Sequence, residues 1–175
     1  MNLKTFVRSI YDYPKKGILF RDITSLIEDS RAFSYALKRM HKISKKIKHN
    51  KIAGIESRGF IFASALAYLN KKPLVLIRKK NKLPGKKISQ KFNLEYGTDK
   101  IEVHKSSLNK NDKVIIIDDL IATGGTAIAS AKLVEKCKAN VAAFIFLIDL
   151  YDLKGNRKLK SKNYKTFKLI DFPGH

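Results

Sequence analysis

The chain of 175 residues is long enough for one domain with a sizeable core, and its 44% hydrophobic content excludes a compositionally disordered protein. Its 37 basic and 15 acidic residues give a formal net charge of +22, which favours anionic ligands and polyanionic partners. The single cysteine, Cys137, excludes an internal disulfide and fits a reducing, cytoplasmic setting.

The distribution of charge favours a solvated basic surface over a specific nucleic-acid site. Lysines are scattered along the whole chain, and no aromatic-interleaved basic motif and no zinc-ligand spacing occurs. The longest apolar run, Val141 to Ile148, is too short to cross a bilayer, and the N-terminus lacks the apolar core of a signal peptide. We therefore expect a cytoplasmic protein with no membrane partner and no specific nucleic acid.

Hydrophobic periodicity predicts helices in the first quarter of the chain. Apolar residues recur at helical spacing over residues 3–10, which predicts a short amphipathic helix ended by Pro14 and Gly17. A longer helical stripe covers residues 33–47, with Ser30 as its expected N-cap.

The remaining chain alternates short apolar runs with helical segments. The runs at residues 51–55, 73–78, 113–117 and 140–150 predict strands, and residues 60–69 and 125–138 predict helices. Residues 81–97 are polar and contain glycine, so they predict a long loop or a hairpin, which in a compact domain tends to be functional.

Strands that are apolar on both faces and separated by helices predict an α/β fold with a central, mainly parallel sheet flanked by helices. Ligands of such sheets bind outside the carboxyl ends of the strands. This rule brings three segments to one edge: Glu56 to Arg58, Arg78 with the loop after it, and Asp118 to Thr126.

The segment from Ala122 to Thr126, ATGGT, has the chemistry of a phosphate cradle. Gly124 and Gly125 allow close backbone approach, successive amides can point at an anion, and the start of a helix adds partial positive charge. The alternative is an ordinary turn before a helix. The segment is neither a GxGxxG fingerprint nor a Walker A loop.

Two adjacent carboxylates, Asp118 and Asp119, precede this cradle. They could accept hydrogen bonds from sugar hydroxyls, stabilise a positive centre, or hold magnesium through water. The alternative is a solvated strand end, which we disfavour because adjacent acids repel each other unless something binds them.

The stretch VIIIDDLIATGGT, Val114 to Thr126, closely resembles the phosphoribosyl-pyrophosphate signature of the type I phosphoribosyltransferases. Residues 13–27, 53–62, 77–85 and 94–104 are similar to segments of the adenine-specific members of that family, in the same order. Lys16, Ser25 and Asn81 depart from the usual proline, proline and glycine of the family, without removing a group that the chemistry needs.

The resemblance implies a type I phosphoribosyltransferase fold, with residues 1–175 as a single domain, a flexible hood or loop region and a flexible catalytic loop at about 79–104. It implies transfer of the 5-phosphoribosyl group from phosphoribosyl pyrophosphate to adenine, giving AMP and pyrophosphate. It also implies Mg²⁺ as cofactor, held through substrate and water without direct protein ligands, and a homodimer.

The resemblance assigns a role to each candidate residue. Asp118 and Asp119 are expected at the ribose, where positive charge develops during transfer. The other assignments are Ala122, Thr123, Gly124, Gly125 and Thr126 for the 5′-phosphate; Glu56, Ser57, Arg58, Arg78 and Lys82 for pyrophosphate; the backbone of Leu19 and Arg21 with the ring of Phe20 for adenine; and Glu95, beside Tyr96, for the proton of the base. The family typically has a cis peptide between the positions of Glu56 and Ser57.

Two alternatives stay open. One is a regulator with this fold that binds nucleic acid, which the charge of +22 motivates. Such a regulator would need an added DNA-binding module, for which 175 residues leave no room. The other is the same reaction on another purine, such as hypoxanthine or xanthine.

Overall fold

The computed structural model describes residues 1–93 and 98–174. The helices are η1 (Leu3–Phe6), α1 (Thr24–Glu28), α2 (Ser30–Ser44), α3 (Gly59–Asn70), α4 (Gly125–Lys136), η2 (Tyr151–Leu153) and α5 (Gly155–Lys160). The strands are β1 (Arg8–Ile10), β2 (Phe20–Asp22), β3 (Lys51–Ile55), β4 (Leu74–Lys79), β5 (Lys87–Asn93), β6 (Thr98–His104), β7 (Lys113–Ile121), β8 (Asn140–Leu150) and β9 (Thr166–Phe172).

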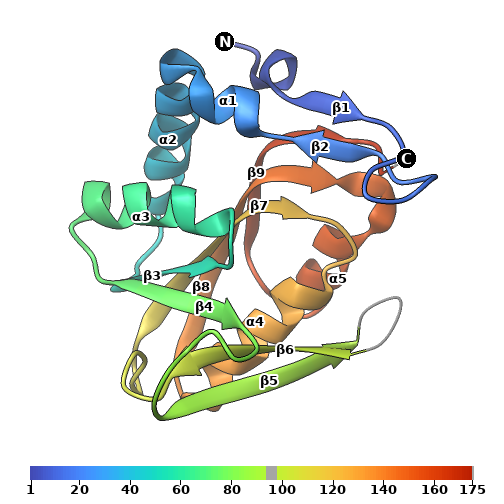
Figure 1. Ribbon diagram of the computed structural model, residues 1–175. Helices are drawn as coiled ribbons and strands as arrows, with labels where there is room; N and C mark the ends of the chain where they lie inside the picture. Colours follow the sequence, from blue (N-terminus) through green and yellow to red (C-terminus); the bar gives the residue numbers. More distant parts are fainter. Residues whose placement is uncertain (94–97, 175) are drawn as a thin grey trace.

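A central sheet with the order β5-β6-β4-β3-β7-β8-β9 organises the molecule (Figure 1). Neighbouring strands pair in parallel along the series β4-β3-β7-β8-β9, while β6 is antiparallel to both β4 and β5. The prediction of a mainly parallel sheet flanked by helices is therefore confirmed. A separate antiparallel pair, β1 and β2, lies near the chain's C-terminal end in Figure 1.

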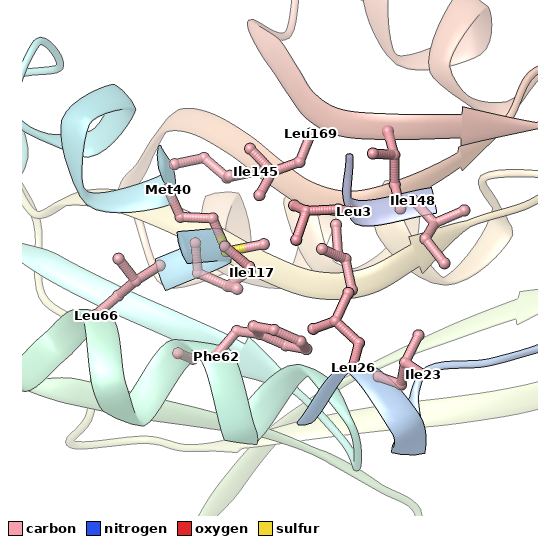
Figure 2. Close-up of a cluster of buried hydrophobic side chains, with 14 of the residues drawn as sticks. Leu3, Ile23, Leu26, Met40, Phe62, Leu66, Ile117, Ile145, Ile148 and Leu169 are labelled. Atoms are coloured by element: carbon pink, nitrogen blue, oxygen red, sulfur yellow. The ribbon is translucent and has the colours of Figure 1, made fainter. Parts of the chain in front are cut away.

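Both faces of the sheet carry apolar cores, as runs without polar alternation require. One core joins the sheet to η1, α1, α2 and α3, and includes Leu26, Met40 and Phe62 (Figure 2). The other lies beneath α4, α5 and the β5–β6 hairpin. Strand β7 serves both cores, because Ile115 and Ile117 belong to the first while Val114 and Ile116 belong to the second.

Three local predictions need correction or refinement. The amphipathic helix predicted over residues 3–10 is wrong: it stops as the 3₁₀ turn η1, and the chain continues as β1, where pairing with β2 supplies its backbone hydrogen bonds. The N-cap of α2 is Asp29, whose side chain accepts from the amides of Arg31 and Ala32. Residues 81–97 are predicted to form a long loop or a hairpin. Their described part contains β5, which forms a hairpin with β6.

No helix in the described ranges is both long and apolar enough to cross a membrane.

Candidate active site

A cavity of about 450 Å³ opens at the carboxyl ends of β3, β4 and β7. Its walls come from the segment Glu56–Arg58 after β3, from Lys79 on β4, and from the continuous stretch Asp118–Ala127. Phe92 and Asp99 of the β5–β6 hairpin close another side. The expected meeting of three segments at one edge is confirmed, because parallel strands bring their carboxyl ends together.

The ATGGT segment forms the turn from β7 into α4. Gly124 has φ +84°, a left-handed conformation that favours glycine, and α4 begins at the next residue. The first intrahelical bond runs from the amide of Ile128 to the carbonyl of Gly124. The amides of the preceding turn thus have no partner within the helix, and they lie in the wall of the cavity, where an anion would satisfy them.

Asp118 and Asp119 occupy the end of β7 and line the same cavity. The amide of Asp119 donates to Oδ1 of Asp118 at 2.9 Å, and Arg58 Nε lies 2.9 Å from Oδ2 of Asp119. Burial raises the pKa of Asp118 well above its usual value, and the charge of Asp119 raises it further. Burial also raises the pKa of Asp119, although Arg58 opposes this rise. The two carboxylates therefore have too few hydrogen-bond donors and cations nearby to stabilise both of them in the ionised form.

Gly59 explains how Asp118 fits so tightly. A Cβ on Gly59, at the start of α3, would lie 2.8 Å from Oδ1 of Asp118 and 2.8 Å from the carbonyl oxygen of Ile117. Only a glycine allows α3 to begin this close to β7. No sequence motif signals this role of Gly59, because the contact joins segments almost sixty residues apart.

Phe20 on β2 lies against Arg58, whose guanidinium carbon is 5.2 Å from the ring centroid. Tyr13 also packs edge-on against the ring of Phe20, with ring centroids 5.1 Å apart. Arg58 therefore bridges the aromatic ring of Phe20 and the carboxylate of Asp119. The sequence placed all three residues near one ligand, but it could not reveal this bridge.

The side chain of Arg21 turns away from this aromatic surface. It is buried, donates to the carbonyl of Pro173 at 3.0 Å and to Ser9 Oγ, and covers the ring of Phe172. The side chain of Arg21 is thus engaged elsewhere, and the backbone role expected for Arg21 stays a prediction. Leu19, two residues before Arg21, is half-buried.

Glu56 and Arg78 pair with each other. The Nε and Nη2 atoms of Arg78 lie 3.1 and 3.2 Å from the carboxylate, which also accepts from the amide of Lys79 at 2.8 Å. The hydrogen bond from Arg78 lowers the pKa of Glu56 despite partial burial. The cation of β4 that lines the cavity is Lys79 and not Arg78, while Lys82 lies outside its wall. Sequence reasoning missed Lys79, although it directly follows Arg78.

The peptide bond between Glu56 and Ser57 is cis, as the family resemblance implies. Glu95 and Tyr96 lie outside the described residues, between β5 and β6. Within the described part of the chain, no group of three or more His, Cys, Asp or Glu side chains is arranged to hold a metal ion.

The fold and this edge of the sheet define a phosphoribosyltransferase domain, and a family model with the description "Phosphoribosyl transferase domain" matches residues 25–174. An adenine phosphoribosyltransferase of Pelagibacter ubique is 61% identical over 175 residues, with both chains fully covered. The chain belongs to the adenine phosphoribosyltransferase family.

Solved structures agree with this assignment. The adenine phosphoribosyltransferase of Thermoanaerobacter pseudethanolicus superposes with a TM-score of 0.93 at 44% identity, covering 97% of this chain and 98% of that one. The Saccharomyces cerevisiae enzyme, in complex with an imino-altritol bisphosphate and adenine, has a TM-score of 0.87 at 35% identity, with 95% of each chain covered.

Proposed function

We propose that this chain transfers the 5-phosphoribosyl group from phosphoribosyl pyrophosphate to adenine, forming AMP and pyrophosphate in purine salvage. The main support for the proposal is the continuous stretch Asp118–Ala127 of the cavity wall. Its two carboxylates have few hydrogen-bond donors near them, and they lie directly before the loop whose amides can bind an anion. A phosphorylated sugar presents hydroxyls and a phosphate along its own length, in the same order.

At the ribose, breaking the bond to pyrophosphate builds positive charge on C1. Asp118 and Asp119 accept hydrogen bonds from the ribose hydroxyls and stabilise that charge electrostatically, in a partly buried site where such interactions are strong. Their fixed position at the end of β7 means that little reorganisation accompanies the reaction. The 5′-phosphate lies on the amides of Ala122, Thr123, Gly124, Gly125 and Thr126, with the two threonine hydroxyls as further donors.

The departing pyrophosphate needs cations and donors. In our proposal the backbone amide of Ser57 supplies a donor, with Arg58, Arg78 and Lys82 as cations. The amide of Glu56 already donates to the carbonyl of Ile77 at 2.9 Å, so Glu56 contributes by holding this segment against β4. The pairing of Arg78 with Glu56 reduces its net attraction for an anion, so Lys79, whose side chain is exposed at the cavity, is a further candidate for this role.

Adenine binds on Phe20, with backbone groups of Leu19 and Arg21 at its polar edge. A flat base between Phe20 and Arg58 requires two contact distances of about 3.5 Å each, which exceeds the present ring-to-guanidinium distance. Since that distance is 5.2 Å, adenine binding must move Arg58 away from Phe20. Arg58 then covers the face of the base opposite Phe20, and its contact with Asp119 couples the two subsites.

Glu95 handles the proton that adenine loses from its ring, as the family resemblance implies. We expect Glu95→Gln to lower turnover strongly, by about 100-fold or more, with a modest loss of donor binding. Single-turnover kinetics with adenine would measure this, and unchanged turnover would remove Glu95 from the proton role.

Magnesium fits this site through the substrate. Oδ2 of Asp119 is buried and has no aligned hydrogen-bond partner, so the pair can accept bonds from metal-bound water, although the described residues form no protein cage. A magnesium ion bound in this way would neutralise pyrophosphate oxygens and orient them against the ribose hydroxyls. Asp118 and Asp119 would then hold its water shell.

The chain acts as a single domain and as a homodimer. Five large apolar side chains are exposed on α3 and on the neighbouring edge of β4, namely Ile61, Tyr68, Leu69, Leu74 and Leu76. We call them the α3–β4 patch. Contiguous exposed apolar surface of this kind is typical of an interface, and a second copy of the chain is its proposed occupant. A buried, unpaired Cys137 fits a cytoplasmic location.

The proposal is tested by offering purified protein, magnesium and phosphoribosyl pyrophosphate a panel of adenine, hypoxanthine, xanthine and guanine. We expect nucleotide from adenine with a kcat/KM at least about 100-fold above that for the other purines, because a site built for one polar edge leaves its own groups unpaired with another. Nucleotide from hypoxanthine alone would transfer the proposal to the alternative purine.

A further inference from the structure

The phosphate loop, Ala122–Thr126, is held by a segment from the other end of the chain. Strand β8 ends beside the loop, and η2 leads from it into α5. The amide of Gly155 donates to the carbonyl of Ala122 at 3.0 Å, and Lys158 Nζ donates to the carbonyl of Thr123 at 3.2 Å. Two consecutive carbonyls of the loop therefore bond to the start of α5.

Position 155 requires glycine because a side chain would have no space there, and not because of its backbone angles. A Cβ at this position would lie 2.2 Å from the carbonyl oxygen of Ala122 and 2.7 Å from the amide nitrogen of Gly124. In the reverse direction, a Cβ on Gly124 would lie 3.0 Å from the Cα of Gly155. Both obstacles are backbone atoms, which cannot rotate aside, so any larger residue at position 155 must displace the loop.

The loop's carbonyls and amides belong to the same peptide planes. Fixing the carbonyls of Ala122 and Thr123 therefore fixes the direction of the amides of Thr123 and Gly124. Amides that already point in the right direction bind an anion without the entropy cost of ordering the loop.

We propose that Gly155 and Lys158 are positioning residues for the 5′-phosphate, holding the phosphate loop from α5 in the shape that binds it. The proposal rests on the proposed function, since that function supplies the phosphorylated ligand. Neither residue lines the cavity, so both act through the loop.

The test compares AMP with adenosine, which lacks only the 5′-phosphate, by calorimetric titration of the full-length protein. We expect Gly155→Ala to weaken AMP binding by about 10- to 100-fold, because hydrogen bonds to a charged group are lost, while adenosine binding stays within about twofold. General damage to the fold would weaken both ligands alike, and either that result or unchanged AMP affinity would overturn the proposal.

Lys158→Met provides a second test of the proposal, which can be used even if Gly155→Ala fails to fold. It removes one exposed ammonium, and we expect AMP affinity to fall about threefold with adenosine unaffected. Lys160→Met is the matched control, because Lys160 is an exposed lysine of the same helix that makes no hydrogen bond or ion pair through its side chain among the described residues. An equal response of the two lysine variants would contradict the role of Lys158.

The same titrations distinguish failure of the positioning role from failure of the proposed function. If the unaltered protein binds AMP no more tightly than adenosine, the proposed function fails. If it prefers AMP and the variants keep that preference, only the positioning role fails.

Discussion

At the residue scale, the paired carboxylates connect stability with function. The pKa of Asp118 is raised because burial and the charge of Asp119 disfavour its ionised form. A carboxyl group whose pKa is higher in the folded state stabilises the fold while protonated, and this contribution is lost as the pH rises through the folded pKa. Ionisation of Asp118 as the pH rises therefore opposes folding.

We predict that Asp118→Asn raises the melting temperature at pH 7 and lowers turnover by about 100-fold or more. The amide keeps an oxygen for the 2.9 Å bond from the amide of Asp119, but it cannot stabilise developing positive charge. Calorimetric scans between pH 4 and pH 8 measure the first effect. The gain should shrink towards acidic pH, where the wild-type carboxyl is protonated, and a loss of stability at pH 7 would contradict this account.

Single residues also show what the sequence could predict. The loop Ala122–Thr126 and its neighbouring aspartates were predictable because they are contiguous, so one motif carries all the geometry. The partners of Arg58 and Arg78 were not, because they depend on which side chains meet across segments. Arg58 lies between Phe20 and Asp119, and Arg78 pairs with Glu56.

At the scale of elements, one buried carboxylate joins the two strands of the β5–β6 hairpin to each other and to the chain after β4. Glu102 is fully buried and lies 3.0 Å from Lys87 Nζ and 3.1 Å from Lys100 Nζ, and it accepts from the amide of Asn81 at 3.2 Å. Burial alone would raise the pKa of Glu102, but these hydrogen bonds outweigh burial and lower it. This group thus helps to hold the hairpin that carries Phe92 and Asp99 into the cavity.

We predict that Glu102→Gln lowers the free energy of unfolding by about 2 kcal/mol at pH 7, since charged hydrogen bonds of a buried group are lost. The difference should narrow as the pH falls through the lowered pKa of Glu102, because a protonated wild-type group loses the same bonds. Urea denaturation at several pH values measures it. Glu28→Gln, at an exposed position, is the control, and an equal effect in both variants would refute the anchoring role.

The elements that periodicity predicted well are those with strong apolar patterns, such as β3, β7 and α2. Strand β2 and helices α1 and α5 have three to six residues each, too few for a period to appear. They are defined by tertiary contacts, such as the bond from Gly155 to Ala122.

At the scale of the whole molecule, the net charge of +22 opposes compactness. We predict that the melting temperature rises by several degrees between low salt and 0.3 M NaCl, because salt at 0.1 M already screens charges beyond about 10 Å. Differential scanning fluorimetry in a salt series measures this. A melting temperature that falls or stays constant would show that self-repulsion does not limit stability.

The α3–β4 patch gives a second prediction at this scale. Tyr68 is 84% exposed, and Tyr68→Asp should convert the dimer to monomers in light scattering after size-exclusion chromatography, because a charge then enters an apolar interface. Phe167→Asp, on the strand at the far edge of the sheet, should leave the dimer intact. Monomeric wild-type protein would contradict the proposed assembly.

We propose that the cavity wall Asp118–Ala127 binds a phosphorylated sugar whose pyrophosphate is replaced by adenine. The most direct test follows AMP and pyrophosphate together in one reaction with magnesium, phosphoribosyl pyrophosphate and adenine. We predict equal amounts of both products and no pyrophosphate release without adenine. Pyrophosphate released in excess of AMP, or no AMP at saturating donor, would contradict the account.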